Sequence, residues 1–175
     1  MGDLIALVNQ DDVVTAFADK LDVHANGLLH RAFSVFIFNS QREMLIHRRA
    51  SDKYHSPGLW TNACCSHLPQ NFSMEDAVNN RLDYEMGISC NLAHLFTFHY
   101  TVNFDHGLIE NEIDHVYCGF FDGIPRPNPT EVSEWKWENP ENLYHQIKSS
   151  PGDYTYWFRY IMDNFSNKIK SYCIK

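Results

Sequence analysis

The apolar run from residue 32 to residue 38 is the feature that most constrains the fold. Its sequence, Ala-Phe-Ser-Val-Phe-Ile-Phe, is rich in aromatic and β-branched residues, which favour strands over helices. The polar stretch 39–42 leads directly into a second apolar run at 44–48. We therefore predict that these two runs form a β-hairpin.

Strand and helix patterns then follow one another without a regular βαβ alternation. Further strands are predicted over 4–8, near 13–14, around 92–102, around 115–121 and over 132–137. Ser73 and Asp76 resemble a capping box that opens a helix, and Gly87 is suited to end it. Two more helices are predicted over 141–148, after Pro140, and over 154–169. This mixture predicts an α+β sandwich.

The length and composition are those of one globular domain, which we expect to span residues 1–175. Hydrophobic residues make up 44% of the chain and charged residues 21%, and no apolar run approaches the length of about 18 residues that a membrane helix requires. The amino terminus shows no basic region followed by a long apolar stretch. Five cysteines in such a chain do not indicate a disulfide framework. We expect a cytoplasmic monomer with no membrane partner.

The charge balance argues against a nucleic-acid partner. The formal net charge is −8, and the basic residues form no run, whereas nucleic-acid surfaces need clustered Lys and Arg. A small phosphorylated ligand is still compatible with an acidic chain, because bound divalent cations can reverse the local field.

Three segments concentrate metal-binding and proton-transfer groups. They contain His24 with His30, Cys65 with His67, and Glu110 with Glu112. Three imidazoles and two carboxylates could surround Mn²⁺, Mg²⁺ or Zn²⁺. In an extended strand the two glutamates would face the same side, because side chains alternate.

Each of these signals is weak alone. Most histidines are solvated or hydrogen-bonded, two glutamates at this spacing are usually a polar strand face, and adjacent cysteines are usually structural. The other histidines show no partner pattern and are taken as structural or surface residues; they are His47, His55, His94, His99, His106, His115 and His145.

The helix that ends at Gly87 resembles the Nudix box, whose core Arg-Glu-x-x-Glu-Glu-x-Gly supplies carboxylates for Mg²⁺ beside a pyrophosphate. Asn80 stands in the Arg place, Arg81 and Tyr84 stand in two Glu places, and only Glu85 and Gly87 remain. One carboxylate can bind one Mg²⁺ but is poorly equipped to activate water. The helix is therefore consistent with holding a diphosphate without cleaving it.

Five segments contain most of the charged and metal-binding residues discussed above: Lys20-x-x-x-His24, residues 29–34, 48–54, 57–67 and 110–112. In combination they resemble the type 1 isopentenyl-diphosphate isomerases of the Nudix superfamily. Their order and gaps hold from near residue 4 to Trp157. The resemblance implies a Nudix-like mixed β-sheet sandwich flanked by helices, with isopentenyl and dimethylallyl diphosphate as the small-molecule substrates.

The resemblance also implies a role for individual residues. Cys65 and Glu112 match the catalytic pair, and Tyr100 would work beside Glu112. The metal ligands implied are His24, His30, His67, Glu110 and Glu112, with Mn²⁺, Zn²⁺ or Mg²⁺. Glu85 and the backbone carbonyl of Cys65 match a Mg²⁺ site that engages the diphosphate. The substrate-binding residues implied are Lys20, Arg49, Lys53, Ser66, Arg81 and Trp157.

The chain departs from the family pattern at three points. The interval between His24 and His30 is a residue shorter than in some relatives, Leu68 separates His67 from Pro69, and Asn80 replaces a commonly basic residue. None of these removes a group that proton transfer requires.

Moving the double bond requires an acid on one face of the substrate and a base on the other. We expect Glu112 with Tyr100 on one face and Cys65 on the other, while Trp157 stabilises the cation. The main alternative is a Nudix-type pyrophosphohydrolase. A non-enzymatic metal-binding domain, or a thiol hydrolase using Cys65 and His67, are weaker alternatives.

Overall fold

The structure, a computed structural model, describes residues 4–53, 55–104 and 107–173. The strands are β1 (Leu4–Val8), β2 (Val14–Asp19), β3 (His30–Phe38), β4 (Met44–Arg49), β5 (Trp60–Thr61), β6 (Cys64–His67), β7 (Leu92–Asn103), β8 (Ile109–Phe120) and β9 (Val132–Glu138). The helices are α1 (Lys20–Asn26), α2 (Met74–Met86), α3 (Pro140–Ser149), the 3₁₀ turn η2 (Pro151–Asp153) and α4 (Tyr156–Cys173).

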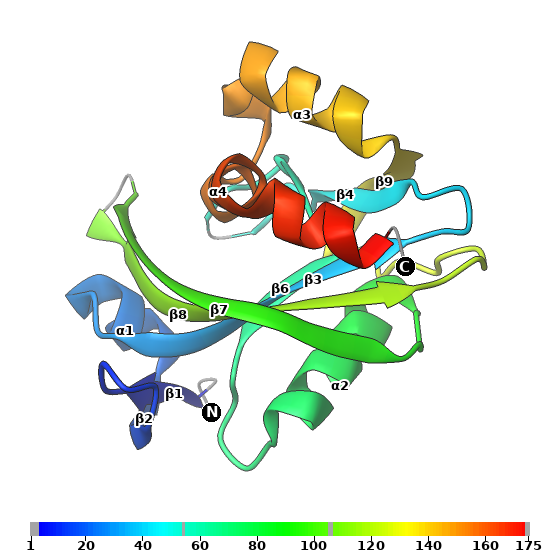
Figure 1. The fold of residues 1–175 in the computed structure, drawn as a ribbon. Coiled ribbons are helices and arrows are strands. Elements are labelled where there is room, and N and C mark those ends of the chain that lie inside the picture. The colour runs from blue at the N-terminus through cyan, green and yellow to red at the C-terminus, as the bar shows by residue number, and fades with distance from the viewer. Residues whose placement is uncertain (1–3, 54, 105–106, 174–175) are drawn as a thin grey trace.

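Strand β3 lies at the centre of the sheet and has partners along both edges. On one edge it pairs in parallel with β8, in a register that places His30 opposite Glu112. On the other edge it pairs antiparallel with β6, with Ala32 opposite His67. Strand β7 pairs with β8, and these long strands cross the middle of the molecule (Figure 1).

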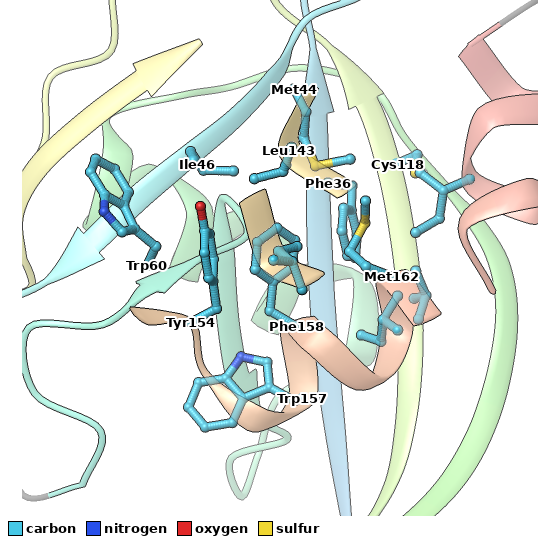
Figure 2. Packing of buried hydrophobic residues seen from close by; sticks show 14 of the residues in the cluster. Phe36, Met44, Ile46, Trp60, Cys118, Leu143, Tyr154, Trp157, Phe158 and Met162 are labelled. Carbon is cyan, nitrogen blue, oxygen red and sulfur yellow. The ribbon is translucent and has the colours of Figure 1, made fainter. Parts of the chain in front are cut away.

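Helices cover the sheet on two sides. Helices α3 and α4 lie on one side and α2 lies on the other (Figure 1). Leu143 and Phe158 belong to the apolar cluster on the first side, which Figure 2 shows together with Met44, Trp60 and Trp157. The α2 helix contributes to a second cluster; its residues there include Val78, Leu82 and Met86. The expected α+β fold is confirmed.

The apolar run of β3, residues 32–38, is explained by burial on both faces of the strand. Phe36 and Phe38 pack in the cluster of α3 and α4, whereas Phe33, Val35 and Ile37 pack in the cluster of α2. A strand covered on both faces reads as a continuous apolar run rather than as an alternating one.

The predicted hairpin of residues 32–48 is wrong beyond its turn. β3 and β4 pair only at Phe38 and Met44, because β6 and β8 already occupy the two edges of β3. β4 instead pairs along its length with β9, from Met44 opposite Glu138 to Arg49 opposite Val132.

The predicted helix ends are confirmed for α2 and α3. The Ser73 side chain accepts a hydrogen bond from the Asp76 backbone N–H at 3.1 Å, and Gly87 ends α2 in the left-handed conformation, with φ of 62°. Pro140 is the first residue of α3, after the N-cap Asn139.

Several elements differ from the sequence prediction. α1, β5 and β6 were not predicted, β2 continues to Asp19, and β8 begins at Ile109 rather than near His115. Asp19 caps α1, since its side chain accepts from the Leu21 backbone N–H at 2.9 Å. Within the described ranges, no helix is both long enough and apolar enough to cross a membrane.

Gly87→Ala should destabilise the protein strongly. A Cβ at this position would lie 2.8 Å from both the Cβ and the carbonyl oxygen of Arg126, in a backbone conformation that L residues disfavour. We expect a loss of about 2–4 kcal/mol in the free energy of unfolding, the sum of the left-handed conformation and overpacking. Thermal and urea unfolding would measure it.

Gly58→Ala is the matched control for the conformational part. Gly58 has φ of 70° but has open space where a Cβ would lie, so only about 1–2 kcal/mol should be lost. Equal losses in the two variants would contradict the role of the Arg126 contact.

Candidate active site

The candidate metal ligands from three sequence segments meet at one end of the sheet. His24, His30, His67, Glu110 and Glu112 are all buried, and each offers a ligand atom within 4.8 Å of the others. His30 begins β3, His67 ends β6, and the two glutamates lie at the start of β8. The pairings of β3 with β6 and β8 therefore assemble the group.

The imidazole rings are oriented by backbone contacts. Nδ1 of His24 lies 2.5 Å from the Lys20 carbonyl oxygen and Nδ1 of His30 lies 2.8 Å from that of Leu28. With Nδ1–H donating to these carbonyls, each Nε2 is directed towards the carboxylates. Nε2 of His24 lies 3.1 Å from Oε2 of Glu110.

Glu112 is the centre of the polar contacts. Its Oε1 lies 3.0 Å from Nε2 of His67 and 3.3 Å from Nε2 of His30. Its Oε2 accepts a hydrogen bond from the Tyr100 hydroxyl at 2.5 Å. Burial raises the pKa of Glu112, but His30 and His67 outweigh that effect and hold it well below its usual value.

The donor set fits a divalent cation. Nε2 of His30 and Oε2 of Glu110 are buried without a hydrogen bond of standard geometry. Although burial lowers the pKa of His30, Glu110 and Glu112 together raise it to about 10. A proton on His30 therefore offsets part of the negative charge of Glu110 and Glu112. A bound metal ion would neutralise the same charge. Imidazole and carboxylate ligands in this number suit Mn²⁺, Zn²⁺ or Mg²⁺.

Cys65 lies across β3 from the carboxylates. Its thiol donates to Oδ1 of Asn62 at 3.0 Å, and its sulfur lies 3.6 Å from the Ser34 hydroxyl. Burial and the nearby Asp114 raise the pKa of Cys65 to about 12, against the hydrogen bonds of Ser34 and Asn62. The thiol therefore keeps its proton at neutral pH.

A single cavity brings the proton-transfer groups together with the basic residues. Its walls include Cys65, Glu112, Tyr100 and Trp157. The predicted substrate-binding residues lining it are Lys20, Arg49, Lys53, Ser66 and Arg81.

Two small residues of β3 form part of the same cavity wall. Ala32 and Ser34 lie opposite His67 and Cys65 in the pairing with β6. The next residues on that face, Phe36 and Phe38, are large and buried in the core. Neither is among the described residues that line the cavity.

The Trp157 side chain is fixed by two contacts. Its indole N–H donates to the Thr61 hydroxyl at 3.0 Å, and the guanidinium carbon of Arg49 lies 5.4 Å from the ring centre. The ring is thus held against the cavity and already attracts a cation.

The predicted Mg²⁺ ligand Glu85 is not among the described residues that line the cavity. Oε1 of Glu85 lies 2.5 Å from Nε of Arg81, and Arg81 itself lines the cavity. Burial raises the pKa of Glu85, with Arg81 opposing that effect. A cation at Glu85 would have to replace this ion pair.

Sequence reasoning missed three residues of the site. His55, taken as structural or surface, lines the cavity, with its Nε2 3.6 Å from Oε1 of Glu110. Asp114 continues the face of Glu110 and Glu112 and accepts from the Ser34 hydroxyl at 2.8 Å; strand alternation could have indicated it. Glu131 contacts two of the basic residues, and no sequence signal pointed to it.

Of the remaining histidines, those that the structure describes do not line the cavity, and His99 and His145 are exposed. His47 is buried in β4, where burial and Arg49 lower its pKa to about 3, consistent with a structural residue. His94 and His115 pack against each other away from the cavity, with ring centres 5.4 Å apart. His106 lies outside the described residues.

Glu110→Gln should weaken divalent-metal binding by about tenfold or more, because one anionic ligand is lost from a buried group. Metal content after dialysis against limiting Mn²⁺, measured by mass spectrometry, would check this. His145→Ala, on the exposed side of α3, is the control that should retain the metal of the wild type. Equal metal content in both variants would contradict the assignment.

Iodoacetamide should label Cys65 slowly at neutral pH. Because the pKa of the thiol is raised to about 12, the reactive thiolate fraction should grow about tenfold for each pH unit up to pH 10. Site-resolved mass spectrometry of the metal-free protein would follow the rate. A rate that levels off below pH 9 would show that the thiol is ionised at lower pH.

Comparison with known proteins shows the family. The NUDIX domain family matches residues 28–158. Isopentenyl-diphosphate Delta-isomerase 2 of Aromatoleum aromaticum is 43% identical over 93% of this chain and 86% of its own. The isopentenyl-diphosphate Delta-isomerase of Serratia proteamaculans is 43% identical over 93% of this chain and 90% of its own.

Solved structures show the same fold. A crystal structure from Deinococcus radiodurans has a TM-score of 0.70 at 21% identity and covers 84% of this chain and 90% of its own. The MutT protein of Methanosarcina mazei has a TM-score of 0.66 at 17% identity and covers 81% of this chain and 96% of its own. The structures show the fold alone, whereas the matched NUDIX domain and the sequence relatives show that the chain belongs to the isopentenyl-diphosphate Delta-isomerase family of the Nudix superfamily.

Proposed function

We propose that this protein interconverts isopentenyl and dimethylallyl diphosphate, with Cys65 and Glu112 as the proton-transfer pair. The observation that supports this assignment is one cavity that holds a thiol, a carboxylate and a cluster of basic side chains. The printed names of the relatives agree with it.

The reaction needs two proton carriers on opposite sides of the substrate. One adds a proton to the alkene and forms a tertiary cation; the other removes a proton from the neighbouring carbon. Cys65 lies on β6 and Glu112 on β8, separated by β3. Cys65 lies opposite Ser34 and Glu112 lies opposite His30, so the two residues are also offset by four positions along β3. Both side chains line the same cavity, and the allylic skeleton would lie between them.

The two carriers begin in different protonation states. Cys65 keeps its proton, while Glu112 is ionised and accepts the Tyr100 hydroxyl. Burial and Glu112 raise the pKa of Tyr100 well above its usual value, so Tyr100 can hold a proton beside the carboxylate. Because the interconversion is reversible, each carrier donates in one direction and accepts in the other.

Trp157 would protect the cationic intermediate. Its ring lines the cavity and is fixed by the hydrogen bond to Thr61. A desolvated indole face stabilises a cation by about 2 kcal/mol. The aromatic and buried surroundings also exclude water, which would otherwise trap the cation as an alcohol.

Divalent metals fit two places in this proposal. The three histidines with Glu110 and Glu112 would hold Mn²⁺, Zn²⁺ or Mg²⁺. Glu85, in place of its contact with Arg81, would hold Mg²⁺ at the diphosphate together with the Cys65 carbonyl. Bound there, a metal supplies positive charge that favours ionised carboxylates and a bound diphosphate. Lys20, Arg49 and Lys53 would complete the neutralisation of the diphosphate.

Cys65→Ala and Glu112→Gln should each lower kcat by about a thousandfold, since each removes one proton carrier. NMR of the purified protein with isopentenyl diphosphate and Mg²⁺ in D₂O would follow dimethylallyl diphosphate and deuterium incorporation. Cys90→Ala, a half-buried cysteine outside the cavity, is the control and should keep the wild-type rate.

Two outcomes would count against the proposal. A near-normal rate in either Cys65→Ala or Glu112→Gln would refute the pair. Release of phosphate products by the wild-type protein, without isomerisation, would instead indicate a Nudix-type pyrophosphohydrolase.

A further inference from the structure

We propose that Glu131 is a positioning residue for diphosphate binding, which holds Lys53 and Arg81 in place from behind the cavity wall. The inference rests on the proposed function for the identity of the anion. Its basis is that a single carboxylate oxygen contacts both cations: Oε2 of Glu131 lies 2.7 Å from Nζ of Lys53 and 2.6 Å from Nη2 of Arg81.

Glu131 stands behind the cations rather than among the lining residues. Lys53 and Arg81 line the cavity, whereas Glu131 is not among the described residues that do. Its side chain is only 12% exposed, compared with 20% for Lys53 and 29% for Arg81. The carboxylate therefore contacts the basic groups from the protein side and leaves their other donors for an anion.

The backbone around Glu131 is fixed to the elements that carry its partners. Its carbonyl accepts from the Ala50 N–H at 2.9 Å, which ties it to the segment that leads to Lys53. Its own N–H donates to the Asn128 carbonyl at 3.0 Å, and the Asn128 N–H donates to the Glu85 carbonyl at 2.9 Å. The carboxylate is thus fixed relative to α2 and to the segment after β4.

A fixed counter-charge is needed because several cations converge here. Lys20 and Arg49 line the cavity together with Lys53 and Arg81, and like charges at such a site repel one another. Lys and Arg also have long side chains whose ordering costs entropy. The Glu131 carboxylate offsets the repulsion and restricts two of these side chains before the diphosphate binds.

Glu131 also gives Arg81 a second partner. Arg81 uses Nε for Glu85 and Nη2 for Glu131. If Glu85 held a divalent cation, the first contact would be weakened, whereas the second does not involve Glu85. Glu131 would then keep the guanidinium at the cavity.

Glu131→Gln tests the proposal directly, since it removes the charge and keeps the size. We expect inorganic pyrophosphate with Mg²⁺, measured by titration calorimetry, to bind about tenfold more weakly, equivalent to about 1.4 kcal/mol. In the isomerase assay KM should rise by a similar factor, while kcat changes by less than about threefold. A purely structural role would not produce this separation of KM from kcat.

Glu134→Gln is the matched control, because it removes the same charge nearby. Glu134 lies on β9 with its side chain 56% exposed, and its contact is with Arg48 at 3.7 Å. Its pyrophosphate affinity should equal that of the wild type. An equal loss in the two variants, or tighter binding in Glu131→Gln, would overturn the proposal.

A second experiment separates this role from a simple loss of stability in Glu131→Gln, by making the same substitution in Lys53→Ala protein. If Glu131 acts through Lys53, the weakening of pyrophosphate binding should be smaller in Lys53→Ala protein than in the wild type. An undiminished effect there would refute the mechanism. Pyrophosphate binding does not depend on turnover, so failure to isomerise would count against the proposed function and leave this test intact.

Discussion

The parallel pairing of β3 with β8 is the constraint on which the site depends. It joins segments about 80 residues apart and sets His30 opposite Glu112. Because β6 occupies the other edge of β3, Cys65 must lie across that strand from the carboxylates. A shift of one residue in either register would turn these side chains to the opposite face of the sheet, where α2 and its apolar cluster lie.

Burial makes the site both costly and specific. Ionised groups lose hydration when they are buried, and the loss is tolerated only where opposite charges or metals compensate. Here three imidazoles face two carboxylates, and the basic side chains face Glu85 and Glu131. An overall charge of −8 therefore does not prevent the cavity from presenting positive charge to an anion, because the field within it is set by neighbours a few ångströms away.

The sequence predicted the parts of this site that have local signatures. The caps of α2, the position of Pro140 at the start of α3, the alternation that aims Glu110 and Glu112 to one side, and the apolar run of β3 all follow from neighbouring residues. The strands that pair with β3 cannot be predicted in this way. A strand buried on both faces shows the same apolar pattern whichever strands lie beside it. This is why a hairpin was predicted where β4 leaves to pair with β9.

Residues that act through another side chain were the hardest to find. Glu131 lies in a turn and shares no spacing with Lys53 or Arg81, which come from distant segments. His55 likewise lies near Glu110 only because of the path that the chain takes after β4. By contrast, Asp114 could have been predicted from the sequence, since it extends the alternation of Glu110 and Glu112 by one more step along β8.

The α2 helix differs from that of a Nudix hydrolase in a way that supports the proposed function, in which a diphosphate is bound and not cleaved. Arg81 and Tyr84 stand where a hydrolase has carboxylates, and the Tyr84 side chain is exposed, with the guanidinium of Arg81 5.3 Å from its ring centre. The nearby Glu131 could have replaced one of these missing carboxylates. Its Oε2, however, already accepts hydrogen bonds from Lys53 and Arg81. Activating water on phosphorus requires several free carboxylates around metal ions. Under the proposed function, a guanidinium in place of these carboxylates would give a surface that holds a phosphate rather than one that attacks it.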